Sequence, residues 1–105
     1  MIWYDHIFLG KGCRKNAARL REKISRRQMH AGVYLIVLPE SGHALLEIIP
    51  SMVLLQECYP ADSLRVVGMA ATRREAFSLV EKILGEVYQN CGNLNEVAAY
   101  LEQYR

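Results

Sequence analysis

Two short segments of this chain combine glycines with basic side chains, each directly after a stretch typical of a β-strand. The first segment runs from Gly10 to Lys15 and the second from Gly68 to Arg74. A helical pattern follows each one, so free backbone N–H groups and cations gather at helix starts, where anions bind favourably. The sequence therefore predicts a site for nucleic acid or a phosphorylated ligand, made by Lys11, Gly12, Arg14, Lys15, Thr72, Arg73 and Arg74.

The two turns match no established phosphate-binding motif. Neither reads as G-x-x-x-x-G-K-[ST] or as G-x-G-x-x-G. The alternative interpretation is that the glycines and polar residues only make good turns and helix starts. The turns can share one anion only if the strands before them run parallel, because both turns then open on the same edge of the sheet.

Basic residues are concentrated at the start of the chain. The whole chain has a net charge of +2, but residues 1–27 carry +6 and residues 28–105 carry −4. A cluster of cations along one helix is typical of a nucleic-acid-binding surface. No aromatic residue lies among these cations to stack a base. The alternative is therefore a solvated face, or one that docks on the acidic part of another copy.

The remaining reactive side chains form no recognisable constellation. The three histidines and three cysteines lack the spacing of metal ligands, and we expect neither a metal nor another cofactor. The widely spaced, odd number of cysteines indicates reduced thiols in a cytosolic protein. The sequence contains neither a nucleophile elbow nor a pair of carboxylates placed for general acid–base catalysis. These features favour a protein without catalytic activity, although an enzyme site completed at a dimer interface, with Cys13 or a histidine, remains an alternative.

Size and composition indicate one domain spanning residues 1–105. The chain has 105 residues, of which 51% are hydrophobic, which is enough for a core. No apolar run approaches the ~20 residues of a membrane span. The first ten residues have no basic region of the kind that opens a signal peptide. We therefore expect a cytoplasmic protein that does not bind membranes.

The order of apolar runs and turns predicts an α/β (α+β) fold. We expect a two-layer sandwich in which a four-stranded mixed sheet carries two long helices and one or two short ones, mainly on one face. The second and third strands should pair antiparallel. The predicted strands are Ile2–Leu9, Val33–Leu38, Ala44–Ile49 and Leu64–Met69, in the order β-α-β-β-(short turn or helix)-β-α-α.

The predicted helices differ in how clearly they are marked. The first spans Cys13–Gln28 and has a narrow apolar stripe. The second begins at a capping box formed by Thr72 and Glu75 and ends near Gly92. Its apolar stripe consists of Ala76, Phe77, Val80, Ile83, Leu84, Val87 and Tyr88.

Two further segments close the chain's secondary structure. Ser51–Glu57 fits either a short helical turn, with Ser51 as its cap, or an additional strand. Asn93 and Glu96 have the spacing that starts a last short helix.

The number of aromatic residues indicates a surface that contacts a partner. Two long helices cannot easily cover both faces of a sheet, and an uncovered apolar face is typical of a partner surface. Two-fold dimers are the commonest homo-oligomers. The sequence therefore favours a small cytosolic, non-catalytic interaction or regulatory domain that forms a homodimer, with nucleic-acid or phosphate-ligand binding as the alternative.

Overall fold

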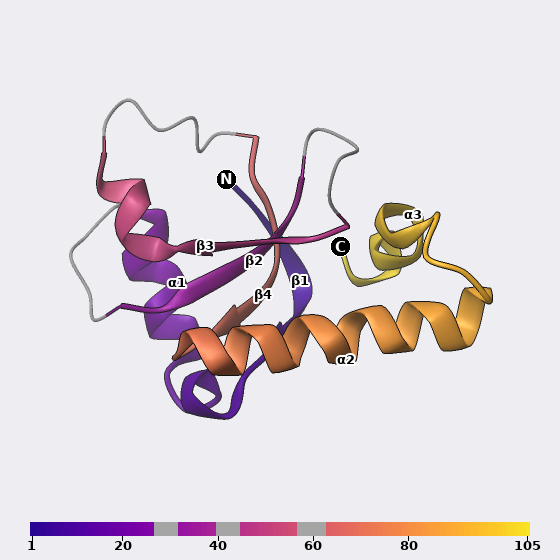
Figure 1. Cartoon of the computed structure of the whole chain (residues 1–105). Helices are drawn as coiled ribbons and strands as arrows, with labels where there is room; N and C mark the ends of the chain where they lie inside the picture. The colour runs from indigo at the N-terminus through magenta and orange to yellow at the C-terminus, as the bar shows by residue number, and fades with distance from the viewer. Residues whose placement is uncertain (27–31, 40–44, 57–62) are drawn as a thin grey trace.

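The chain folds around one mixed β-sheet that carries helices on both faces (Figure 1). The computed structural model describes residues 1–26, 32–39, 45–56 and 63–105. In chain order, with η for a 3-10 helix, the elements are β1 (Ile2–Leu9), η1 (Lys11–Cys13), α1 (Ala17–Ser25), β2 (Tyr34–Leu38), β3 (Glu47–Pro50), η2 (Ser51–Leu55), β4 (Arg65–Ala70), α2 (Arg73–Cys91), α3 (Val97–Leu101) and η3 (Glu102–Tyr104). This order is the predicted one.

The four strands lie in the order β1-β4-β2-β3, so the two central strands are β4 and β2. β2 pairs antiparallel with β3, as predicted, and also antiparallel with β4. β1 and β4 are adjacent and parallel. The mixed four-stranded sheet is thus confirmed, and the parallel pairing of β1 and β4 meets the condition under which the two glycine-containing turns open on the same edge.

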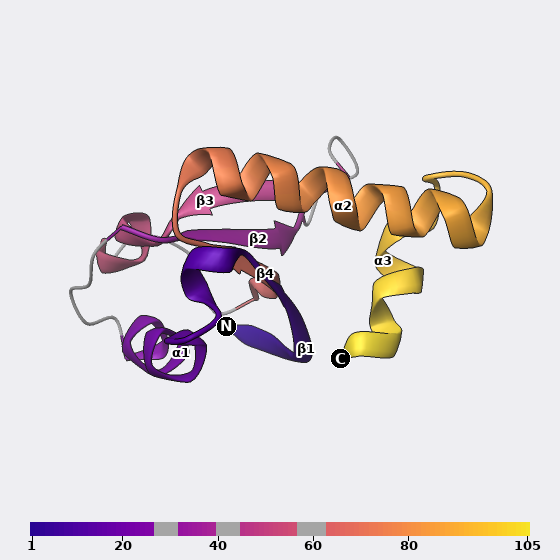
Figure 2. The same ribbon diagram turned by 90° about the horizontal axis from the view of Figure 1, so that it is seen from below.

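Both faces of β2 are apolar, and each is covered. Leu35 and Val37 belong to one core cluster, with Ile24 of α1 and Leu54 of η2. Ile36 belongs to the opposite cluster, which α2 and α3 cover. In Figure 2, α2 and α1 lie on opposite sides of the sheet. The helices therefore divide between the two faces instead of lying mainly on one, because a central strand that is apolar on both sides needs a cover on each.

The first helix is shorter than predicted. α1 begins at Ala17 instead of Cys13, because residues Lys11–Cys13 form a 3-10 turn that buries the Cys13 side chain. Its other predicted residues, from position 27 on, lie outside the described part. Trp3 of β1 holds α1 in place: its indole Nε1 donates to Ser25 Oγ at 2.9 Å, and the Arg21 guanidinium lies over its ring.

The face that α2 presents to the sheet differs from the predicted stripe. Leu79, which the stripe omitted, is buried with Ile83 and Val87. Phe77 and Tyr88 were placed in the stripe, but they are 52% and 60% exposed. The apolar arc of α2 is wider than the surface it buries, since α2 packs on β4, β2 and β1 and its outer edge stays in solvent.

A carboxylate of α2 binds two tyrosines of the C-terminal segment, whose Val97 and Leu101 are buried in the same core cluster as α2. Glu86 Oε2 accepts hydrogen bonds from the Tyr100 hydroxyl at 3.1 Å and the Tyr104 hydroxyl at 2.7 Å. The hydrogen bond to Glu86, and then burial, raises the pKa of the Tyr104 phenol above its ordinary value. Gly92 ends α2 at a φ of 77°, as predicted, in the left-handed region that glycine adopts most readily.

Two predicted caps have other roles. Ser51–Leu55 is a 3-10 helix, which decides between the helix and strand alternatives, and Glu57 lies outside the described residues. The Ser51 side chain does not cap it: Ser51 Oγ accepts from the Val33 backbone N–H at 3.3 Å and joins η2 to β2. Asn93 accepts from the Asn95 N–H and forms a turn before α3, which begins at Val97 without a side-chain cap.

Helix lengths and compositions also bear on membrane insertion. Across the described ranges, none of the helices combines the length and apolar character needed to cross a membrane.

Candidate anion-binding site

The two glycine-containing turns lie side by side, as their role in one site requires. β1 and β4 end at the same edge of the sheet because they are parallel neighbours. Past the end of β1, the Gly10 N–H donates to the Met69 carbonyl of β4 at 2.9 Å. This bond places η1 beside the start of α2. Residues about sixty positions apart in the chain thus meet at the carboxyl ends of two strands. Ligands bind at this edge in open α/β sheets.

The space between the two turns is filled by a carboxylate of the chain itself. Glu75 Oε1 accepts from the Ala71 N–H at 3.1 Å and from the Gly12 N–H at 3.2 Å. Glu75 Oε2 lies 3.3 Å from the same Gly12 nitrogen. The turns therefore do hold an anionic group, as their backbone predicts, but that group is a side chain rather than a ligand.

The glycines of the first turn make room for this carboxylate. A Cβ atom at Gly10 would lie 1.9 Å from Glu75 Oε1. A Cβ atom at Gly12 would lie 2.5 Å from the Cβ of Ala71. A side chain at Gly12 would collide with Ala71, and one at Gly10 would displace the Glu75 carboxylate, so these glycines are explained without phosphate binding.

Half of the predicted capping box forms as expected. Thr72 Oγ1 accepts from the Glu75 N–H at 3.1 Å and caps α2. The reciprocal bond, from the Thr72 N–H to the Glu75 carboxylate, is replaced by the bonds to Ala71 and Gly12. Glu75 thus connects the two turns instead of only closing the end of its own helix.

A pocket of about 450 Å³ opens beside Glu75, and we call it the cationic pocket. Two of its basic side chains, Lys11 and Arg14, come from the first turn. Two more, Arg74 and Lys82, come from α2. The other lining residues are Leu9, Gly10, Thr72, Glu75, Ser78 and Leu79.

The structure brings together only part of the predicted site. Four predicted residues line the cationic pocket: Lys11, Arg14, Thr72 and Arg74. Gly12 contributes its N–H to Glu75, and Lys15 is exposed outside the pocket lining. Arg73 points to a different pocket.

Two polar residues of the pocket were missed from sequence. Ser78 and Lys82 follow Arg74 at intervals of four, the spacing of one face of a helix. That spacing, applied outward from Arg74, would have found them.

The charge of the cationic pocket is only partly balanced. Among the described residues, Lys11, Arg14, Arg74 and Lys82 form no ion pair; the pairs found there join Arg26 to Glu22 and Arg105 to Glu102. The Glu75 carboxylate is the acidic group of the lining, and it is already bonded to backbone N–H groups. Four cations against one carboxylate leave a surplus of positive charge that favours an anionic ligand.

Cys13 lies under the site, in the core between η1 and the sheet. Burial, and then the nearby Glu75 carboxylate, raise the pKa of its thiol. A buried thiol with a raised pKa stays protonated at neutral pH and is a poor nucleophile.

The other candidate reactive groups are scattered or undescribed. Cys91 is half-buried at the end of α2, and His6 is exposed on β1. His30, His43 and Cys58 lie outside the described ranges. Within those ranges, no three His, Cys, Asp or Glu side chains are placed to share a metal ion.

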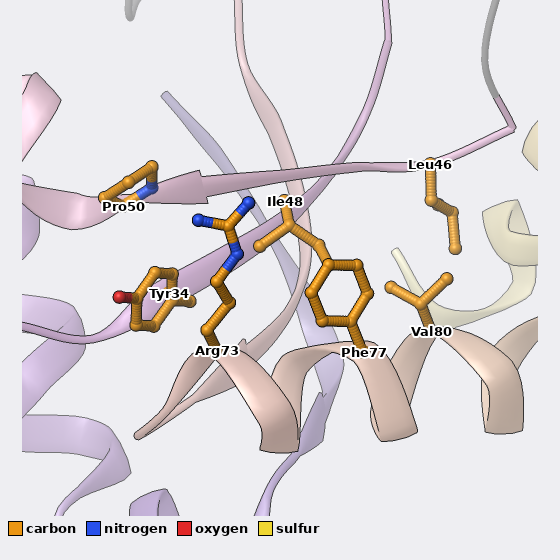
Figure 3. Close-up of a pocket in the computed structure, with 7 residues that line it drawn as sticks. All are labelled: Tyr34, Leu46, Ile48, Pro50, Arg73, Phe77 and Val80. Atoms are coloured by element: carbon orange, nitrogen blue, oxygen red, sulfur yellow. The ribbon is translucent and has the colours of Figure 1, made fainter.

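A second pocket, of about 360 Å³, lies between α2 and the edge of the sheet, and we call it the apolar groove (Figure 3). α2 contributes Arg73, whose guanidinium lies 5.8 Å from the centre of the Phe77 ring. In Figure 3, Ile48 lies opposite Phe77 and Leu46 lies toward Val80. Tyr34 and Pro50 lie on the side of the groove where Arg73 is. The full lining is Tyr34, Leu46, Ile48, Pro50, Arg73, Phe77 and Val80.

Comparisons with known proteins add no further information on the site. No family model matches the chain, and neither curated proteins nor solved structures gave a match.

Proposed function

We propose that this domain binds a phosphate-bearing ligand in the cationic pocket. The observation that carries the proposal is the set of four basic side chains, two from the turn after β1 and two from α2, that line one pocket without ion-pair partners among the described residues. Like charges held close together repel, and an anion in the pocket would relieve that repulsion. No catalytic step is part of the proposal.

Two features of the pocket support binding of phosphate over binding of a neutral ligand. The pocket lies at the start of α2, where the helix dipole favours negative charge. Arg14 and Arg74 carry guanidinium groups, whose planar arrangement of donors matches the oxygen atoms of phosphate. Ser78 and Thr72 add hydroxyl groups that can donate to the same oxygens.

Isothermal titration calorimetry with inorganic tripolyphosphate tests the proposal. We expect binding by the wild-type protein at low salt that weakens as salt rises. The pocket variant, Arg74→Gln/Lys82→Gln, should lose this binding. A control variant with the same change in charge, Lys15→Gln/Arg19→Gln, alters exposed cations outside the pocket lining and should keep it. Equal affinity of the pocket variant and the wild-type protein would overturn the proposal.

The apolar groove supports a second candidate function, self-association as a homodimeric interaction domain. The side of β3 that faces α2 is only partly covered, because Ile48 is half-buried and lines the groove. Phe77, at the groove, is 52% exposed although it is one of the largest apolar side chains of α2. β3 is also an edge strand, with one side free of strand partners in the described sheet. An exposed edge beside an apolar groove is a typical surface for pairing with another chain.

Sedimentation velocity over a range of protein concentrations tests self-association. We expect a dimer that Phe77→Glu shifts toward the monomer, because the substitution places a charge inside the apolar contact. Tyr88→Glu is the control, since Tyr88 is an exposed aromatic residue of α2 outside the groove lining. A wild-type protein that stays monomeric at every concentration would contradict this candidate function.

A further inference from the structure

We infer that the phosphate-bearing ligand of the cationic pocket is a single strand of nucleic acid, bound through several successive phosphates of its backbone. This inference rests on the proposed function and specifies its ligand class. Three observations carry it: the spread of the cations along α2, the contribution of further cations by the turn after β1, and the carboxylate that already occupies the space between the turns.

The cations of α2 are spread along the helix instead of being gathered at its first turn. Arg74, Ser78 and Lys82 follow one another at intervals of four and form one row along the helix. Because an α-helix rises 1.5 Å per residue, the Arg74 and Lys82 backbones are about 12 Å apart along its axis. A ligand with phosphates repeated along its length can contact both ends of this row at once.

A second element contributes cations to the same pocket. Lys11 and Arg14 come from the turn after β1, whereas Arg74 and Lys82 belong to α2. A groove with cations along it tracks a nucleic-acid backbone without reading its sequence. None of the described residues of the lining is aromatic, so none of them can stack on a base. We therefore expect binding with little dependence on sequence.

Glu75 argues against a compact phosphate ligand between the two turns. Its carboxylate accepts the N–H groups of Gly12 and Ala71, which a single phosphate would otherwise use in that space. A ligand in the pocket is then bound mainly by side-chain cations, whose contacts depend on charge density more than on the shape of one anion. The pocket has a volume of about 450 Å³, enough for a short segment of one strand.

Fluorescence anisotropy with labelled oligouridylates, one short and one several times longer, tests the inference over a series of salt concentrations. We expect the long oligouridylate to bind more tightly than the short one. It should also bind more tightly than tripolyphosphate, whose affinity is measured by competition for the same site. Each phosphate contact contributes about 0.7 to the slope of log affinity against log salt for a single strand. The pocket variant should therefore lower that slope by about 1.4, whereas the control variant leaves it unchanged.

The possible outcomes separate this inference from the proposed function. Pocket-dependent binding of tripolyphosphate without tighter binding of the long oligouridylate would overturn the inference and leave the proposed function standing. Tighter binding of a duplex of equal length would also overturn it. Equal loss in the pocket and control variants would assign RNA binding to the basic surface around α1 instead. Binding of neither probe at low salt would overturn the proposed function itself.

Discussion

Replacing Glu75 with alanine is expected to lower the free energy of unfolding by about 2–3 kcal/mol, which is large for a residue that is not buried. The Glu75 carboxylate accepts from the N–H groups of Gly12 and Ala71 and so joins the turn after β1 to the start of α2. Hydrogen bonds to charged groups contribute about 1.5–3 kcal/mol each, so two of them would sum to about 3–6 kcal/mol, and the partial exposure of Glu75 lowers the combined effect below that sum. Urea denaturation followed by circular dichroism measures the change.

The matched control for this experiment is Glu81→Ala. Glu81 is an exposed carboxylate of the same helix, and its removal is expected to change stability by less than about 0.5 kcal/mol. Glu75→Gln should fall between the two, because its amide oxygen can still accept one N–H but carries no charge. If Glu75→Ala and Glu81→Ala had equal effects, the bonds between the two turns would contribute nothing to stability.

The second large effect is expected at Ile83, whose truncation to alanine should cost about 2–5 kcal/mol. The Ile83 side chain is fully buried between α2 and the sheet. Its removal leaves a cavity as well as losing apolar burial. Phe77→Ala removes a larger side chain from the same helix but should cost less than about 1 kcal/mol, because Phe77 is 52% exposed. Thermal and urea denaturation of both variants measure this difference.

The comparison of Ile83 and Phe77 decides how α2 is rotated on the sheet. Both residues belong to the predicted apolar stripe, so a helix buried along that whole stripe would lose similar stability at either position. A cost at Phe77 equal to that at Ile83 would therefore contradict the orientation described here. It would also remove Phe77 as an exposed contact of the apolar groove.

The strands could be predicted from sequence because each depends on a short, local pattern. The apolar run at the start of the chain and the run that precedes Pro39 predict β1 and β2 within one residue of their observed ends. β3 and β4 were predicted in the right order but with shifted ends. Pro50, which the prediction placed after β3, is its last residue, because an edge strand tolerates a missing N–H.

Helix orientation was less predictable because the apolar residues of α2 exceed what one contact face can bury. The spacing of these residues fits more than one rotation about the helix axis. Only packing on β4, β2 and β1 selects Leu79 for the core and leaves Tyr88 in solvent. The division of helices between two faces likewise depends on which face of β2 each connection reaches.

For the site, the sequence by itself determined the chemistry of its parts: two turns with free N–H groups, a threonine cap on α2 and basic residues near both helix starts. The tertiary structure decided which parts meet. Parallel pairing of β1 and β4 brings Gly12 into contact with Glu75, 63 positions further along the chain. The lining of the resulting pocket includes Lys82 but neither Lys15 nor Arg73. Local patterns depend on neighbours in the chain, whereas these contacts depend on strand order, which only the packing of the whole sheet specifies.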